Sequence, residues 1–308
     1  LKVITEDIKT IFSKGVELSV NDGVDTDVLL KGNGLQRCIV FSLLQTLILN
    51  EKNHLISNET DNTDETPIIL AIEEPELYIH PQLGKLFYDV LKEFSLTDQV
   101  IYTTHSPKFV DVFDYQNISI VSKTREIGTT VINCNIDHFV GLTDRNIFKG
   151  LTQLNADVNE LFFAKKVIIV EGPEDKIAIT EVLKKQNLII NRTEELDITI
   201  TVAGGKQSIP FFIRILKAFD LKFVVLHDLD IRPQMNENDI RTENTRNNNI
   251  LTLAGIERIV NFPIKLEETL GLSNHLKDQY DALKYFQNHE NINEQLESII
   301  NMIIRKLS

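Results

Sequence analysis

Val167-Ile-Ile-Val170 is followed at once by Glu171-Gly172-Pro173-Glu174-Asp175, and Phe223-Val-Val-Leu226 is followed by His227-Asp228-Leu229-Asp230. Each stretch is a short run of apolar, largely β-branched residues that stops at acidic side chains. This pattern is typical of a buried strand that ends at the edge of a sheet. In an open parallel sheet, functional groups gather at the carboxyl ends of the strands. We therefore expect Glu171, Asp175, Asp228 and Asp230 to lie close together.

Four carboxylates at one sheet edge repel one another unless a cation neutralises them. Carboxylate oxygens are hard ligands, which favours Mg²⁺ or Mn²⁺. Paired ions of this kind cleave phosphodiesters by in-line displacement. The pattern predicts a two-metal site in which Glu171, Asp175, Asp228 and Asp230 are both metal ligands and catalytic residues. The plainer alternative is a pair of solvated strand ends whose acids cap the following helices.

The two acidic motifs, Glu-Gly-x-x-Asp and Asp-x-Asp, resemble those of the Toprim fold of topoisomerases, primases and some nucleases. Thr201-Val-Ala-Gly-Gly-Lys206 lies between them, where Toprim nucleases often carry a glycine turn. We expect strands at 167–170, 197–202 and 223–227, with helices at 174–186 and 206–219 between them. Such β/α alternation predicts a parallel sheet.

Three segments of the first half resemble motifs of ABC-type ATPases, in family order. Residues 68–81 resemble a Walker B strand and the D-loop after it, in which Glu73 would hold Mg²⁺ and Glu74 would orient the attacking water. Leu30-Lys-Gly-Asn-Gly-Leu-Gln-Arg37 resembles the ABC signature, which implies nucleotide-binding roles for Gly32, Gly34 and Gln36. Val100-Ile-Tyr-Thr-Thr-His-Ser-Pro107 resembles the H-loop, with His105 as γ-phosphate sensor.

The phosphate-cradling loop G-x-x-x-x-G-K-[ST] does not occur in the sequence. We therefore expect this chain alone not to complete an ATP site, and ATP to bind only together with a region that supplies the Walker A loop. Because the chain opens at Leu1, shortly before the signature segment, we expect the C-terminal part of a longer protein. A naturally split ATPase is the alternative.

An ABC-type head followed by a Toprim domain is the architecture of the OLD (overcoming lysogenization defect) nuclease family, which includes the nuclease subunit of Gabija antiphage systems. Residues 159–172 closely resemble the OLD junction. The resemblance implies an α/β fold with three parts: the C-terminal part of an ABC-type ATPase domain at 1–141, a helical connector at 142–165 and a Toprim domain at 166–308.

Further site residues are implied by the same resemblance. OLD Toprim domains add an acid for the second metal, and Pro263-Ile-Lys-Leu-Glu-Glu268 resembles that segment. Glu267 is favoured slightly over Glu268, and an ordinary acidic helix start is the alternative. The family also uses a late lysine to stabilise charge at the scissile phosphate, which Lys277 or Lys284 would supply.

The resemblance implies a Mg²⁺- or Mn²⁺-dependent DNA endonuclease regulated by its ATPase head, acting in antiphage defence or DNA processing. It implies DNA as the substrate, a homodimer formed through the ATPase head and, in a Gabija-type system, a helicase-like partner. Two other interpretations stay open. One is a non-catalytic ATPase regulator or assembly scaffold with a degenerate Toprim domain, and the other is a Toprim phosphotransferase acting on RNA or a small molecule.

Composition sets limits on these interpretations. A length of 308 residues predicts about two domains, and 42% hydrophobic residues suffice for cores. A net charge of −13 argues against tight, metal-free, non-specific DNA binding. Two cysteines, Cys38 and Cys134, indicate a reducing compartment, and we expect a cytoplasmic protein. No apolar stretch approaches a membrane span, so no membrane contact is expected.

The remaining pattern completes the expected elements. Apolar residues at helical spacing predict a helix over 82–94 whose inward face carries Leu83, Leu86, Phe87, Val90, Leu91 and Phe94. Strands are expected near 100–104, 118–121 and 129–134, and a final helix over 291–307. The polar stretches 50–67 and 234–250 are expected to be loops, the second of them covering the acidic site.

Overall fold

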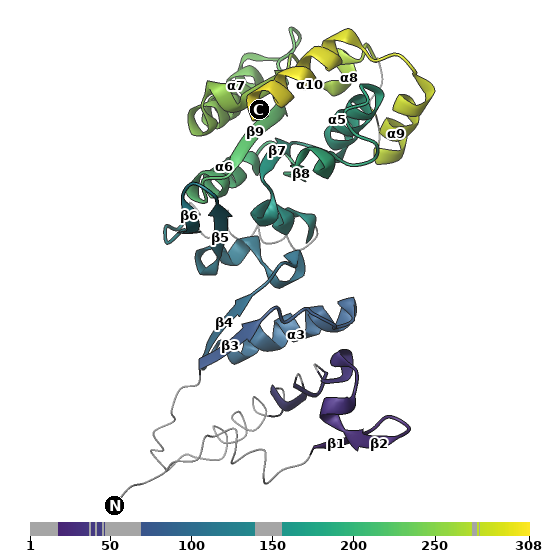
Figure 1. The fold of residues 1–308 in the computed structure, drawn as a ribbon. Helices are drawn as coiled ribbons and strands as arrows, with labels where there is room; N and C mark the ends of the chain where they lie inside the picture. Colours follow the sequence, from purple (N-terminus) through teal and green to yellow (C-terminus); the bar gives the residue numbers. More distant parts are fainter. Residues whose placement is uncertain are drawn as a thin grey trace, which may run out of the picture. The chain divides into compact units, whose positions relative to one another are not determined.

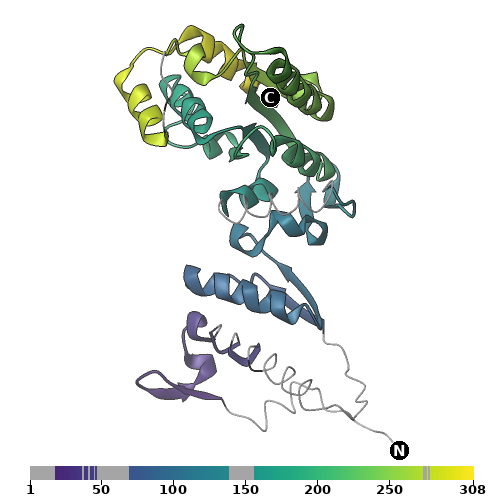
Figure 2. The same cartoon turned by 180° about the vertical axis from the view of Figure 1, so that it is seen from behind.

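The computed structural model describes residues 18–36, 38–40, 42–44, 46, 69–138, 156–272, 276 and 278–308. Figure 1 and Figure 2 show the fold from opposite sides. The chain separates into two compact units, Leu1–Phe109 and Val110–Ser308. The domain boundaries expected at 141 and 165 stay a prediction, since residues 139–155 lie outside the described part.

The first unit contains a parallel pair of strands, β3 (Ile69–Glu73) and β4 (Gln99–Thr103), joined through the helix α3 (Pro81–Phe94). Helix α3 begins after His80, whose side chain accepts from the Gln82 backbone N–H, and Pro81 occupies the first helical position. A short hairpin, β1 (Ser19–Asn21) and β2 (Asp25–Asp27), precedes a 3₁₀ turn, η1 (Val28–Leu30), and a helical segment that starts at residue 33.

Helix α3 confirms the predicted helix, although its buried face is smaller than expected. Phe87, Val90, Leu91 and Phe94 are buried together with Leu44 and Phe109. Leu83 and Leu86 were expected in that core, but they are 38% and 53% exposed, so this part of the prediction is wrong. Helical spacing identifies a common face, and it does not reveal how much of that face neighbouring elements cover.

The second unit opens with short elements that pack beneath its main sheet. These are η3 (Val112–Asn117), the antiparallel hairpin β5 (Ser119–Thr124) and β6 (Gly128–Asn133), and η4 (Ala156–Phe163). The Asn159 side chain ties two of these segments together, because it donates to the Val110 carbonyl and accepts from the Val112 backbone N–H. The predicted strands near 118–121 and 129–134 are confirmed.

A four-stranded parallel sheet forms the centre of the second unit. Its strands are β7 (Lys166–Val170), β8 (Ile198–Val202), β9 (Lys222–Asp228) and β10 (Ile259–Phe262), in the order β10-β9-β7-β8. The longer helices are α5 (Pro173–Lys185), α6 (Ile209–Ala218), α7 (Glu237–Ala254), α9 (Gln279–Asn288) and α10 (Glu294–Leu307). Short turns η5 (Thr193–Leu196), η6 (Ile256–Arg258) and α8 (Leu266–Thr269) complete the unit. None of the described helices has both the length and the apolar character needed to cross a bilayer.

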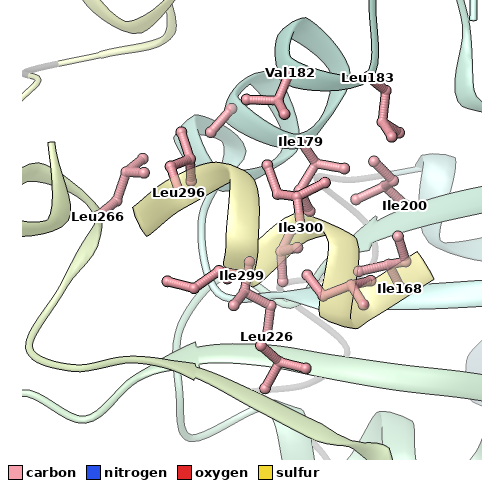
Figure 3. Packing of buried hydrophobic residues seen from close by; sticks show 14 of the residues in the cluster. Ile168, Ile179, Val182, Leu183, Ile200, Leu226, Leu266, Leu296, Ile299 and Ile300 are labelled. Carbon is pink, nitrogen blue, oxygen red and sulfur yellow. The ribbon is translucent and has the colours of Figure 1, made fainter. Parts of the chain in front are cut away.

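Alternate residues of β7 enter two different apolar layers, as expected for a strand covered on both faces. Val167 and Ile169 belong to a layer built with α6, α7 and η4. Ile168 and Val170 belong to the opposite layer, in which α5 and α10 cover the sheet. Figure 3 shows this second layer, with Ile300 of α10 among residues of α5, β7 and β8. The predicted α/β fold with a parallel sheet is confirmed.

The prediction of a loop at 234–250 is wrong, because residues 237–250 form most of α7, an 18-residue helix. Its sequence is rich in asparagine, which has modest helix propensity. Local and tertiary contacts override that preference. Asn236 caps the helix by accepting from the Asp239 backbone N–H, and Ile250 and Ala254 are buried against the sheet layer.

Candidate metal centre

The two acidic motifs meet at the point where the order of strands reverses. β7 and β9 are neighbours in the sheet, while the chain passes from β7 to β8 on one side and from β9 to β10 on the other. Glu171 directly follows β7, and Asp228 is the last residue of β9. Ligands of open α/β sheets bind in the crevice outside the carboxyl ends of strands at such a switch point.

Glu171, Asp228 and Asp230 offer one carboxylate oxygen each, and these oxygens lie within 4.8 Å of one another. Two oxygens of these residues, Glu171 Oε2 and Asp228 Oδ1, are buried and accept no hydrogen bond within the described part of the chain. Buried polar atoms normally have a partner. The unmatched oxygens and the all-oxygen donor set therefore fit a hard divalent cation such as Mg²⁺ or Mn²⁺.

The Asp-x-Asp turn is fixed by its backbone. Asp230 has a φ of 57°, in the left-handed region that aspartate tolerates better than most residues. Its backbone N–H donates to the Ile264 carbonyl at 3.0 Å, and the Asn247 side chain of α7 donates to the Leu229 carbonyl at 2.9 Å. Two hydrogen bonds from separate segments thus hold a conformation that a free chain seldom adopts.

Asp175 lies at the start of α5 and has a structural contact of its own. Its Oδ2 accepts from the Gly172 backbone N–H at 3.0 Å, which satisfies one free donor at the helix start. Burial raises the pKa of Asp175 to about 7, and the charge of Glu171 adds to the rise. Asp175 is not a member of the three-residue group, so its role as a ligand stays a prediction.

Crowding and burial disfavour ionisation of the central acids. Burial raises the pKa of Asp228 to about 9, with further contributions from the charges of Asp175, Glu171 and Asp230. Burial also raises the pKa of Glu171, although the nearby Lys206 ammonium opposes this. In the metal-free cluster Asp228 therefore holds a proton at neutral pH, and a cation would have to displace it.

His227 does not take part in the acid cluster. The residue is 1% exposed, and its Nδ1 lies 2.9 Å from the Asp228 carbonyl. Burial lowers the pKa of His227 to about 4, so the ring is neutral at physiological pH.

Lys206 enters the site from the turn after β8, and the sequence interpretation gave it no site role. Gly204 and Gly205, with φ of 74° and 126°, form that turn, a conformation that glycine adopts without strain. The Lys206 ammonium donates to Asp230 Oδ2 at 2.6 Å and to Glu243 Oε2 of α7 at 2.9 Å. Burial lowers the pKa of Lys206, but the hydrogen bonds to both carboxylates outweigh it and leave a net rise.

The family-derived candidates lie in the segment after β10. Glu267 accepts from the Leu276 backbone N–H at 3.3 Å and lies 3.3 Å from the Lys265 ammonium, whereas Glu268 accepts from Arg232 Nε at 2.9 Å. Neither acid belongs to the three-residue group, and their roles as second-metal ligands stay predictions. Lys277 lies outside the described residues, and Lys284 is exposed on α9.

In the first unit, the candidate ATPase residues gather after β3 and β4. Glu73 pairs with Thr103 in the parallel register, and Glu74, with a φ of 44°, lies 3.5 Å from His105 Nε2 through its Oε1. Glu76 Oε1 accepts from the His105 backbone N–H at 2.8 Å and from the Thr104 hydroxyl at 2.7 Å. Glu76 thus joins the turn after β3 to the turn after β4, a contact that the sequence interpretation missed.

The signature-like segment lies against the turn after β3. A Cβ added at Gly34 would lie 3.0 Å from the Tyr78 carbonyl oxygen, whereas one at Gly32 would meet no atom within 4 Å. Gln36 Nε2 donates to the Lys31 carbonyl at 2.9 Å. Of the two glycines, only Gly34 therefore has a tight contact at the position of a Cβ. The nucleotide-binding roles of Gly32, Gly34 and Gln36 stay predictions.

Comparisons with known proteins agree with this arrangement. Residues 2–110 match the AAA ATPase domain, and residues 162–230 match the TOPRIM domain of overcoming lysogenization defect protein-like proteins. The OLD nuclease of Thermus scotoductus is 33% identical over 223 residues, which cover 68% of this chain and 42% of that protein. The Old nuclease of Escherichia phage P2 is 26% identical over 233 residues, covering 73% of this chain and 38% of that protein.

The Endonuclease GajA of Bacillus cereus (strain VD045) is 21% identical over 263 residues, covering 85% of this chain and 42% of that protein. The chain thus spans about two fifths of the length of these curated relatives. The resemblance to OLD and Gabija proteins that the motifs predicted is confirmed. The chain combines an AAA ATPase domain over residues 2–110 with a TOPRIM domain of the OLD-like type over residues 162–230.

Proposed function

We propose that this chain is the catalytic part of a divalent-metal-dependent DNA endonuclease. The observation that carries the proposal is the group of Glu171, Asp228 and Asp230, with ligand oxygens within 4.8 Å of one another at the switch point of a TOPRIM sheet. The names of the OLD nuclease and Endonuclease GajA relatives support the same class of activity.

Glu171, Asp228 and Asp230 would hold the metal, and Asp175 and Glu267 are the candidates for a second ion. Bound Mg²⁺ or Mn²⁺ supplies a lowered water pKa and neutralises charge on the phosphate. The chain's own residues determine where the metal and the phosphate would bind. The apolar layers behind β7 and β9 exclude water on the sheet side, and the left-handed turn at Asp230 presents that carboxylate to the cluster.

The test is incubation of the 308-residue chain with supercoiled plasmid and Mg²⁺ or Mn²⁺, each with and without ATP. We expect metal-dependent nicking that is lost on Asp228→Asn and on Glu171→Gln. The exposed Asp220, in the turn after α6, provides a matched Asp→Asn control that should cleave like wild type. Nicking that persists in both active-site variants would refute the site. If the wild-type chain binds the metal in a separate titration but cuts no plasmid, the regulator or scaffold interpretation is favoured. If it cuts an RNA substrate but not the plasmid, the phosphotransferase interpretation is favoured.

The first unit is proposed to regulate cleavage rather than to perform it. Glu73, Glu74 and His105 would contact nucleotide once a Walker A loop is supplied, and a head-to-head homodimer would bring two such units together. Antiphage defence and a helicase-like partner are the proposed context if the chain belongs to a Gabija-type system. A change of cleavage rate with ATP in a protein that also carries the Walker A loop, lost on Glu74→Gln, is the expected result.

A further inference from the structure

The Lys206 side chain is placed where a divalent cation would compete with it. Its ammonium lies 2.6 Å from Asp230 Oδ2, and Asp230 also contributes a ligand oxygen to the three-residue acid group. The side chain of Lys206 is only 5% exposed, so it does not reach into solvent as surface lysines do. A buried ammonium with carboxylate partners is a fixed positive charge at the edge of the acid cluster.

Glu243 gives Lys206 a second partner outside the cluster. Its Oε2 accepts from the Lys206 ammonium at 2.9 Å, and its Oε1 pairs with Arg246 one turn along α7. Lys206 therefore links three elements: the glycine turn after β8, the Asp-x-Asp turn after β9, and α7. If Asp230 turns toward a metal, Lys206 retains Glu243 and is not left as an unpaired buried charge.

We propose that Lys206 is a built-in counter-cation of the metal centre, a positioning residue that holds Asp230 before a divalent ion binds and yields Asp230 to that ion while it stays paired with Glu243. This proposal rests on the proposed function only in requiring that the acid cluster binds a divalent ion. According to this proposal, Lys206 has two opposing effects on the site. The ammonium keeps the metal-free cluster and α7 in place, and it weakens metal binding by competition and charge repulsion.

The charges of Lys206 and Glu243 should therefore have opposite effects on the affinity of the site for a divalent ion. Lys206→Met removes the competing cation and largely keeps the length of the side chain. Mn²⁺ should therefore bind at least about tenfold more tightly. This is the size of the repulsion expected between an ammonium and a divalent ion a few ångströms apart, even at a high dielectric constant. Glu243→Gln leaves Asp230 as the one carboxylate partner of Lys206 in this triad. Mn²⁺ should then bind several-fold more weakly.

The experiment is calorimetric titration of the 308-residue chain with Mn²⁺, without DNA, for wild type, Lys206→Met, Lys206→Arg and Glu243→Gln. Lys206→Arg keeps the charge and should stay close to wild type. Because Lys206→Met leaves Glu243 without its lysine, the double variant Lys206→Met/Glu243→Gln is included, and it should bind Mn²⁺ about tenfold more tightly than Glu243→Gln alone. Melting curves in EDTA identify any variant that is not folded.

Weaker or unchanged Mn²⁺ binding on removal of Lys206, in both the single and the double variant, would overturn the proposal, because a merely structural ion pair predicts loss of the site when it is broken. The plasmid assay separates this result from the proposed function. Opposite shifts in Mn²⁺ affinity without any cleavage would support the role of Lys206 and refute the nuclease. Cleavage with unchanged Mn²⁺ affinity would do the reverse, and a wild-type chain that binds no Mn²⁺ would overturn both.

Discussion

Asp228→Asn is expected to stabilise the metal-free second unit, although Asp228 is a proposed active-site residue. The pKa of Asp228 is raised from 3.8 to about 9, first by burial and then by the charges of Asp175, Glu171 and Asp230. The folded chain therefore holds a proton that the unfolded chain releases at neutral pH. As a result, the contribution of Asp228 to the free energy of unfolding of the wild type falls as pH rises from about 4 to about 9. An asparagine at this position has no proton to lose and removes that dependence.

The size of the effect follows from the shift. Between pH 5 and pH 7, both inside the window bounded by the two pKa values, each pH unit changes the unfolding free energy by about 1.36 kcal/mol. The stability advantage of Asp228→Asn over wild type should therefore widen by about 2.7 kcal/mol between these two pH values. For a unit of this size, that change corresponds to roughly 5–10 °C in melting temperature.

The assay is scanning calorimetry of both proteins in EDTA at pH 5 and pH 7, at matched ionic strength. Because the chain forms two compact units, the relevant transition is the one that Mn²⁺ shifts in wild type. Asp220→Asn, the same substitution at an exposed position outside the acid cluster, is the matched control. A difference between Asp228→Asn and wild type that stays constant from pH 5 to pH 7, or narrows, would show that Asp228 ionises in the folded chain and would refute the reasoning.

Mn²⁺ affinity, measured by calorimetric titration, should rise at least about tenfold from pH 6 to pH 8. The reason is that Asp175, with a pKa of about 7, and Asp228, with a pKa of about 9, must release protons when the ion binds. A constant affinity would contradict this. Gly34→Ala should cost the first unit about 1–3 kcal/mol because the new Cβ meets a carbonyl oxygen at 3.0 Å. Gly32→Ala, with open space at its Cβ, is the control, and equal melting temperatures would count against the contact. Ile300→Ala should cost about 2–5 kcal/mol in urea unfolding because Ile300 is fully buried. Met302→Ala, at a position 46% exposed, should cost under about 1 kcal/mol, and a similarly small loss for Ile300→Ala would argue against the packing in Figure 3.

The sheet of the second unit could be predicted because its central strands are apolar without interruption. Val167–Val170 is buried on both faces, so every position selects an apolar residue and the first acid marks the sheet edge. The same reasoning missed β10, Ile259-Val-Asn-Phe262, which has four residues and an asparagine in its middle. That strand forms because β9 offers a free edge beside it, with Asn261 opposite His227 in the parallel register.

Only the site residues that have a recognisable local sequence pattern could be predicted. Glu171, Asp228 and Asp230 each follow an apolar run, and the topology brings them together. Lys206 follows a glycine turn at the end of β8, which is a recognisable position, but nothing near it in sequence indicates two carboxylate partners. Glu243 had no local indication, because it lies in a polar stretch whose helical state depends on tertiary contacts with Lys206 and the sheet.

The alternation of side chains along β9 restricts where the chain can change its length. Leu226 and Asp228 share one face of the strand, while Val225 belongs to the opposite apolar layer. An insertion or deletion of a single residue within Lys222–Asp228 would exchange the two faces and direct the acid into the layer beneath α6. Natural length variation in related chains should therefore avoid this strand and fall in the connections, such as residues 186–197 between α5 and β8, where added residues leave the acidic edge intact.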